Sequence, residues 1–189
     1  LALSLNDAAD SALGGITIMP RVWTLDNFKS VLNSSYIVSA GGVSVARVVI
    51  GTLIAIIVQF SASYVMTKRE LPGRGGLLMF LTVPMFITGG LVPTYMLYSK
   101  IGLLNNFLVY VLPSAFSFYN LIIIRSFIAS IPYELQEAAK IDGASEMRIL
   151  VRIIIPLSLP IIATISLWVA VGYWNDYSTT LYFITQKKY

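Results

Sequence analysis

The residues whose types and spacing could support chemistry gather in one polar stretch, residues 130–156. It contains both acidic and basic side chains: Glu134, Glu137, Lys140, Asp142, Glu146, Arg148 and Arg152. Ser130 and Pro132 are typical helix-start residues, so a helix should begin there. Glu134 and Glu137 would then lie near its N-terminus, where the helix dipole favours anions. This pattern supports recognition of a partner rather than bond making.

The rest of the sequence offers no catalytic set. It contains no Cys and no His, which removes thiolate chemistry and the commonest zinc ligands. The glycine cluster at residues 73–76 lacks the Lys and the Ser or Thr of a phosphate-binding loop and follows no strand. We therefore expect that the chain is not an enzyme and that it binds no metal or cofactor of its own.

Composition places the polar stretch in a membrane protein. The 189 residues are 57% hydrophobic and 12% charged, with a mean hydropathy of +0.78, whereas soluble domains have about twice that charged fraction. Crossing the hydrocarbon core takes roughly 20 apolar residues, and the segments that qualify are 36–67, 76–98, 107–130 and 157–175. Lipid cannot satisfy open backbone groups, and these runs do not alternate as barrel strands do. We expect an all-α, polytopic helical bundle over residues 36–189.

Lys and Arg residues predict the orientation of the bundle. The loops after the first and third spans contain Lys68, Arg69, Arg74, Lys140, Arg148 and Arg152, and the loop after the second contains only Lys100. The positive-inside rule places the loops after the first and third spans in the cytoplasm. Residues 1–35 then form an extracytoplasmic segment. Thr24 followed by the apolar residues Leu25, Phe28 and Val31 predicts a capped amphipathic helix there, on the outer membrane face.

The polar stretch predicts a helix–turn–helix. Gly143 is a natural stop for the first helix. Ser145 can cap the second, whose apolar residues at helical spacing are Met147, Leu150, Val151 and Ile154. Helix connections usually have about 2–8 residues, so a capped, amphipathic connector as long as 131–156 indicates that a soluble partner rests on it. The alternative is a surface hairpin that only links two spans.

Polar residues inside the spans are candidates for a substrate pathway. At about 1.5 Å per residue, Gln59 lies some 14 Å from Lys68, and Asn120 lies about 15 Å from Ser130, so both should be near the midplane. A midplane amide either bonds a neighbouring helix or faces a wet path, and both remain open. Other candidates, each with packing or interfacial anchoring as its alternative, are Tyr119, Trp174 and Asn175.

Two further features of the spans have structural interpretations. Arg47 lies about 31 Å from Lys68 along a helix, which is one hydrocarbon thickness, so its side chain should reach the outer interface. The second span contains several helix-disrupting residues: Pro84, Gly89, Gly90 and Pro93. They predict a kink, although broken spans also flank substrate sites in transporters.

The polar stretch resembles the EAA loop of binding-protein-dependent ABC importer permeases. The family pattern is Glu-Ala-Ala, three residues, Gly, nine residues, Ile, one residue, Leu-Pro. Its counterparts here are Glu137-Ala138-Ala139, Gly143, Ile153 and Ile155-Pro156, with Ile155 in place of Leu. Residues 130–132 (Ser-Ile-Pro), 141–145 (Ile-Asp-Gly-Ala-Ser) and 174–176 (Trp-Asn-Asp) are similar to the sugar branch, in particular to the second permease subunit of maltose-type importers.

The resemblance implies a type I ABC importer transmembrane domain, with four spans seen here of the six usual in the family. It implies a permease for sugars or oligosaccharides in the bacterial cytoplasmic (inner) membrane. Its partners would be a second permease subunit, forming a heterodimer, two ATPase subunits that bind ATP and Mg, an extracytoplasmic substrate-binding protein and membrane lipid, with no nucleic acid.

The resemblance also assigns roles in the loop. The segment from Glu137 to Gly143 would be a coupling helix held in a cleft of the ATPase, with Glu137 paired to a basic group there. The docking residues would be Glu134, Glu137, Ala138, Ala139, Asp142, Gly143 and Ala144.

Two rival functions remain. One is a permease of the same family for amino acids or peptides. The other is an ATP-independent secondary transporter or channel, which would need midplane carboxylates for its coupling ions, and no Asp or Glu lies inside the four spans.

Overall fold

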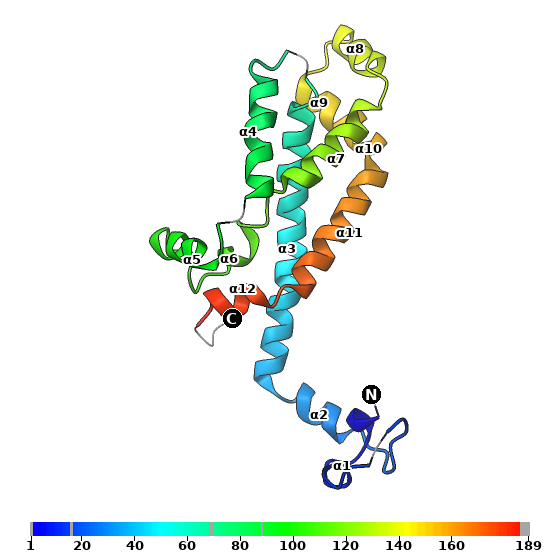
Figure 1. The fold of residues 1–189 in the computed structure, drawn as a ribbon. Helices are drawn as coiled ribbons and strands as arrows, with labels where there is room; N and C mark the ends of the chain where they lie inside the picture. Colours follow the sequence, from blue (N-terminus) through cyan, green and yellow to red (C-terminus); the bar gives the residue numbers. More distant parts are fainter. Residues whose placement is uncertain (1, 16, 69, 88, 186–189) are drawn as a thin grey trace. The chain divides into compact units, whose positions relative to one another are not determined.

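A computed structural model describes residues 2–15, 17–68, 70–87 and 89–185, and the elements in these ranges are helical (Figure 1). They are the 3₁₀ turn η1 (Leu3–Leu5), α1 (Ala8–Ala12), α2 (Asp26–Leu32), α3 (Ser35–Val65), α4 (Arg74–Phe86), α5 (Leu91–Lys100), α6 (Leu108–Val111), α7 (Phe118–Ala129), α8 (Glu134–Ile141), α9 (Glu146–Ile149), the π-helical turn η2 (Leu150–Ile154), α10 (Ile155–Leu157), α11 (Leu159–Asn175) and α12 (Ser178–Phe183). The chain divides into two compact units, residues 1–44 and 45–189. The all-α fold class is confirmed.

The N-terminal unit is organised by the buried amide of Asn6. Its Nδ2 donates to Asp10 Oδ2 at 2.9 Å and to Ser11 Oγ at 3.1 Å, and its Oδ1 accepts from the backbone N–H groups of Arg21 and Val22, both at 2.7 Å. One side chain thus ties three separate segments together. This matters because no apolar residue of η1, α1 or α2 is buried.

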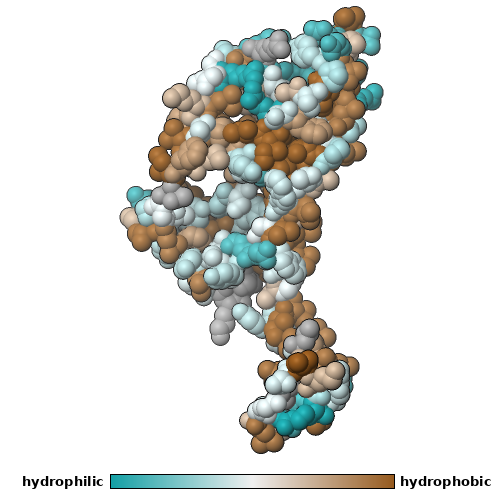
Figure 2. Space-filling view, turned by 45° about the vertical axis from the view of Figure 1, so that its right-hand side comes forward, coloured by the Kyte–Doolittle hydropathy of each residue, from teal (hydrophilic) through white to brown (hydrophobic). Residues whose placement is uncertain are grey.

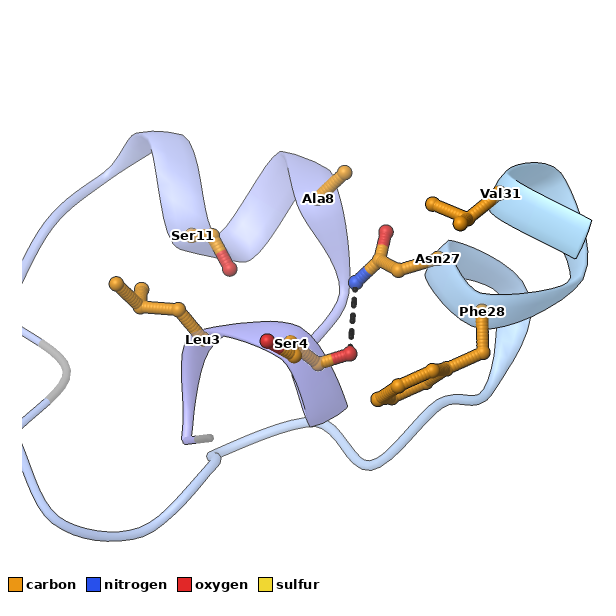
Figure 3. Close-up of a pocket in the computed structure, with 7 residues that line it drawn as sticks. All are labelled: Leu3, Ser4, Ala8, Ser11, Asn27, Phe28 and Val31. Atoms are coloured by element: carbon orange, nitrogen blue, oxygen red, sulfur yellow. Dashed lines mark hydrogen bonds between the residues drawn. The ribbon is translucent and has the colours of Figure 1, made fainter. Parts of the chain in front are cut away.

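The amphipathic helix expected in this unit is α2. Thr24 Oγ1 accepts from the N–H of Asp26 at 3.1 Å and so satisfies one donor of its first turn. Figure 3 shows Phe28 and Val31 of α2 facing η1 and α1 across an apolar cavity of about 480 Å³. Asn27 Nδ2 closes one side of it by donating to the carbonyl oxygen of Ser4 at 3.2 Å.

In the second unit, α3 and α11 cover the first and fourth predicted spans. Within the described ranges, α3 alone is long and apolar enough to cross a membrane as one helix. It approaches α11 closely at Gly51, where a Cβ atom would lie 2.6 Å from the ring of Tyr173. Only a residue without a side chain allows that approach.

The second and third predicted spans are not continuous helices. Segment 76–98 is divided between α4 and α5, which meet at 116°, and Gly90 before α5 has a φ of +80° that favours glycine. Segment 107–130 is divided between the four-residue α6 and α7, with Pro113 between them. A further bend of 79° separates the α9–α10 run from α11, next to Pro160, which has no N–H to donate. If each bent pair is one span, the described residues contain up to three.

A buried apolar cluster joins α3, α7 and α11 to the segment that follows α8. Its members are Phe60, Tyr64, Ile124, Ile128, Ile149, Leu150, Ile154 and Ile165. Hydrophobic side chains also cover much of the outer surface, and hydrophilic ones gather at the end where α8 lies (Figures 1 and 2). A polar end on an apolar bundle fits a loop that leaves the lipid phase.

Candidate functional site

The loop of residues 131–156 folds as the predicted helix–turn–helix, and Gly143 ends its first helix. Gly143 has a φ of +76°. Its N–H donates to the carbonyl of Lys140 at 3.0 Å, and the N–H of Ala144 donates to the carbonyl of Ala139 at 2.9 Å. This pair of bonds is the Schellman arrangement, which requires a left-handed residue and so favours Gly. The prediction of a stop at Gly143 is confirmed.

The start of the first helix differs from the prediction. Ser130 is instead the C-cap residue of the preceding helix, α7, and its hydroxyl donates to the carbonyl of Phe127 at 2.7 Å. A serine that bonds back along its own helix is not available to cap the next one. Helix α8 instead begins at Glu134 after Tyr133, and it still places Glu134 and Glu137 in its first turn.

The second helix is capped as predicted, but its buried face is different. Ser145 Oγ accepts from the N–H of Arg148 at 3.4 Å. Leu150 and Ile154 are buried, whereas Met147 and Val151 are 67% and 50% exposed. The π turn η2 explains the error, because its i→i+5 bonds change the angular spacing that an α-helical pattern assumes.

Glu146 fastens this loop to the end of α3. Its Oε2 accepts from Tyr64 Oη at 2.7 Å and pairs with Lys68 Nζ at 2.7 Å, and its Oε1 pairs with Lys140 Nζ at 2.9 Å. Lys68 Nζ also donates to Oε1 of the buried Gln136 in α8 at 3.0 Å. We call these five residues the Glu146 network. It ties both helices of the loop to α3 and places the loop at residue 68 and the loop 131–156 at the same end of the bundle.

The network holds Glu146 as an anion. Hydrogen bonds from Lys140 and Lys68 lower the pKa of the Glu146 carboxyl to about 2. The same contact with Glu146 raises the pKa of Lys140. Sequence reasoning missed this role, because Lys68 was used only for orientation. The available signal was the i, i+4 spacing of Tyr64 and Lys68, which would place both on one face of a helix that continued to Lys68; α3 ends at Val65, and the two side chains still meet.

The predicted docking residues separate into an outer and an inner group. The outer group is exposed and consists of Glu134, Glu137, Ala138, Asp142 and Gly143. The inner group, Ala139 and Ala144, is half-buried and packs against the apolar cluster. Helix α8 therefore has one face fixed to this chain and one acidic face free for a partner.

The predicted pathway residues are only partly brought together. Gln59 and Asn120 line one cavity of about 250 Å³. Tyr119 lines a different cavity beside α4, of about 440 Å³. Trp174 is 62% exposed, Asn175 is also exposed, and neither lines a cavity with Gln59. The amide of Gln59 also makes a bond between segments, since its Nε2 donates to the carbonyl of Ala115 at 3.2 Å.

Arg47 does not reach outward as expected. It is 5% exposed, its Nη2 donates to the backbone carbonyl of Asp176, and its guanidinium lies 5.3 Å from the ring centroid of Tyr110. A carbonyl and an aromatic face inside the bundle thus replace the interfacial water that snorkelling would provide.

Comparison with known proteins identifies relatives along nearly the whole chain. Protein LplC of Bacillus subtilis (strain 168) is 39% identical over 187 residues, which cover 99% of this chain and 63% of that protein. The polygalacturonan/rhamnogalacturonan transport system permease protein YtcP of the same organism is 37% identical over 170 residues, covering 90% and 59%. The alpha-glucoside transport system permease protein AglG of Rhizobium meliloti (strain 1021) is 30% identical, covering 89% and 46%. The chain thus spans less than two thirds of the length of these relatives.

A solved structure and a family description complete the comparison. The crystal structure of a bacterial ABC transporter involved in the import of the acidic polysaccharide alginate matches with a TM-score of 0.93 at 24% identity, over 99% of this chain and 67% of that one. This match confirms the type I ABC importer transmembrane fold. Residues 47–188 match the family described as "Binding-protein-dependent transport system inner membrane component". The chain therefore belongs to this family, as its EAA-type loop predicts.

Proposed function

We propose that this chain is part of a permease subunit of an ATP-driven importer for sugars or oligosaccharides. The names of its relatives support a sugar substrate, since they include permeases for polygalacturonan/rhamnogalacturonan and for alpha-glucosides. The family description supports a place in the inner membrane. The relatives are transport permeases, which is consistent with a chain that performs no catalysis itself.

The observation that carries the proposal is the two-sided character of α8. Its inner face is fastened to α3 through Gln136, Lys68 and Glu146, and its outer face exposes Glu134 and Glu137. A force applied to the outer face would therefore reach the spanning helix α3 without a flexible link. This is what coupling between an ATPase and alternating access requires.

The proposed partners follow from this role. Two ATPase subunits bind ATP and Mg, and one holds α8 through a basic group opposite Glu137. A second permease subunit completes the pathway as a heterodimer, and an extracytoplasmic binding protein delivers the substrate. The exposed Ala138 allows close approach of the ATPase backbone, as small residues do at helix contacts.

An ATP-independent secondary transporter is the contrasting function. It would need coupling-ion ligands at membrane depth. In the described parts of α3, α4, α5, α7 and α11, the sequence contains no Asp or Glu. A permease of the same family for amino acids or peptides differs only in substrate, and uptake assays separate it.

The test is ATP-driven uptake by the full-length protein, reconstituted with its partner subunits in vesicles, with Gly143 replaced. Gly143→Val places a β-branched residue at a φ of +76°, which costs about 1–3 kcal/mol and displaces the turn. We expect that Gly143→Val abolishes uptake and lowers the amount of ATPase subunit that stays bound to the membrane. Gly143→Asn is the matched control, because Asn tolerates the left-handed region. Uptake that survives Gly143→Val, or that follows an ion gradient without ATP, would refute the proposal.

A further inference from the structure

The cavity shared by Gln59 and Asn120 is polar and lies inside the bundle. Its volume is about 250 Å³, and its other lining side chains include Ser117, Tyr173 and Asp176. This volume is slightly below the range of about 300–1,000 Å³ typical of pockets for drug-sized ligands. It suits one small ring rather than a chain of rings.

The cavity presents hydrogen-bond acceptors whose capacity is not used by the protein. Gln59 is fully buried, and its Oε1 has no hydrogen-bond partner in the described parts of the chain. A buried amide oxygen without a partner costs free energy, and it is satisfied by a ligand that donates. Tyr173 contributes an apolar wall, because its hydroxyl already donates to the carbonyl of Val111 at 3.2 Å.

The lining of the cavity has one acidic side chain, Asp176, which forms no ion pair with a described Lys or Arg side chain. Asp176 follows α11, and its Oδ1 accepts only the N–H of Thr179, at 3.1 Å. The nearby Arg47 is directed to the backbone carbonyl of Asp176 rather than to its carboxylate. None of the described residues that line the cavity is Lys or Arg. A ligand that enters must therefore bring donors, and a second carboxylate would be repelled.

We propose that this cavity is a subsite for one neutral sugar ring, whose hydroxyl groups donate to Gln59 and Asp176, and that Asp176 disfavours a uronate at the same position. The proposal rests on the proposed function, since it concerns the substrate that passes through this subunit. The relatives' names do not lead to this prediction of a neutral ring. Two of the proteins compared above are named for polygalacturonan/rhamnogalacturonan and for the acidic polysaccharide alginate.

The experiment compares galactobiose with digalacturonate, two probes that share ring stereochemistry and differ in the C6 carboxylates. Uptake is measured with the full-length protein in its complete transporter in vesicles. Gln59→Leu should raise the KM for galactobiose about three- to tenfold, the effect of one lost hydrogen bond. Asp176→Asn should raise uptake of digalacturonate relative to galactobiose by about tenfold. The matched control is Thr164→Val, which removes a hydroxyl outside the cavity from α11, the helix that Asp176 follows.

The outcomes separate this subsite from the function itself. If the wild-type transporter moves neither probe nor any other saccharide with ATP, the proposed function fails. If ATP-driven sugar uptake occurs but both cavity variants keep the wild-type KM and the wild-type ratio of the probes, the subsite is refuted. Preferential uptake of digalacturonate that Asp176→Asn leaves unchanged refutes it also. Uptake that needs Na⁺ and loses that need in Asp176→Asn would make the cavity a cation site instead.

Discussion

The loop 131–156 and the α4–α5 segment each follow a predicted span, but they are held in different ways. The loop buries Gln136, Ile149 and Ile154 and is tied to α3 by the Glu146 network. In contrast, no described residue of α4 or α5 is buried. The loop is therefore held by buried side chains, whereas α4 and α5 contact the rest of the chain only through half-buried or exposed ones, such as Leu78 and Leu81 of α4. A coupling element has to be of the first kind, because a loop that moved freely would absorb the motion it should transmit.

The largest difference should appear when an apolar side chain is shortened in each region. Ile154 is fully buried, so Ile154→Ala should destabilise the protein by about 2–5 kcal/mol. Leu97 of α5 is 54% exposed, and Leu97→Ala should change the free energy of unfolding by no more than about 0.5 kcal/mol. Thermal unfolding in detergent measures both. Equal shifts would mean that the loop is no better anchored than α5.

A smaller effect on stability, with a clear effect on coupling, is expected for Glu146→Gln. The change removes both ion pairs and leaves Lys68 and Lys140 without their carboxylate. Because Glu146 is half exposed, the loss of stability should be about 1 kcal/mol or less. Uptake should fall while the partner ATPase still hydrolyses ATP. Asp26→Asn, which removes an exposed ion pair with Lys29 in the other compact unit, is the control and should retain normal uptake per ATP. Unchanged coupling in Glu146→Gln would show that the network is only structural.

The smallest effect should come from pH. The pKa of Glu146 is lowered from 4.5 to about 2, so its contribution is complete above pH 4.5 and is lost as the pH falls from there through about 2. Between pH 7.5 and 5.5 the coupling ratio should therefore stay constant. The measurement is uptake per ATP hydrolysed across this range. A decline centred near pH 6 would mean that another group controls the loop.

Local signals predicted the loop more accurately than the spans. A stop at Gly143 and a cap at Ser145 depend on residues within one turn, which is information that the sequence carries directly. Gly89, Gly90 and the two prolines beside them predicted the break before Leu91, but the break around Pro113 was not predicted, because a hydropathy pattern measures composition and not backbone direction. Met147 and Val151 were assigned to the buried face since nothing local announces a π turn.

Contacts between distant residues were beyond sequence reasoning for a different reason. Glu146 meets Tyr64 and Lys68 only because α3 and the loop pack side by side. Arg47 stays inside the bundle because a backbone carbonyl and Tyr110 lie within its reach. Helical periodicity gives the depth of such residues, but it does not give the neighbour that each one finds there.

The π turn at Leu150–Ile154 links the number of residues in this segment to the direction in which Glu146 points about the helix axis. An α-helix rotates by about 100° per residue, and a π turn accommodates one residue more than an α turn does. Deleting a single residue there would let ordinary α-helical bonds close and would leave Glu146 facing Lys68, whereas deleting one from the α-helical part, between Glu146 and Leu150, would rotate Glu146 by about 100° about the axis. The number of residues between Gly143 and Pro156 thus sets the direction in which the loop points, and the π turn is where this interval can absorb a deletion.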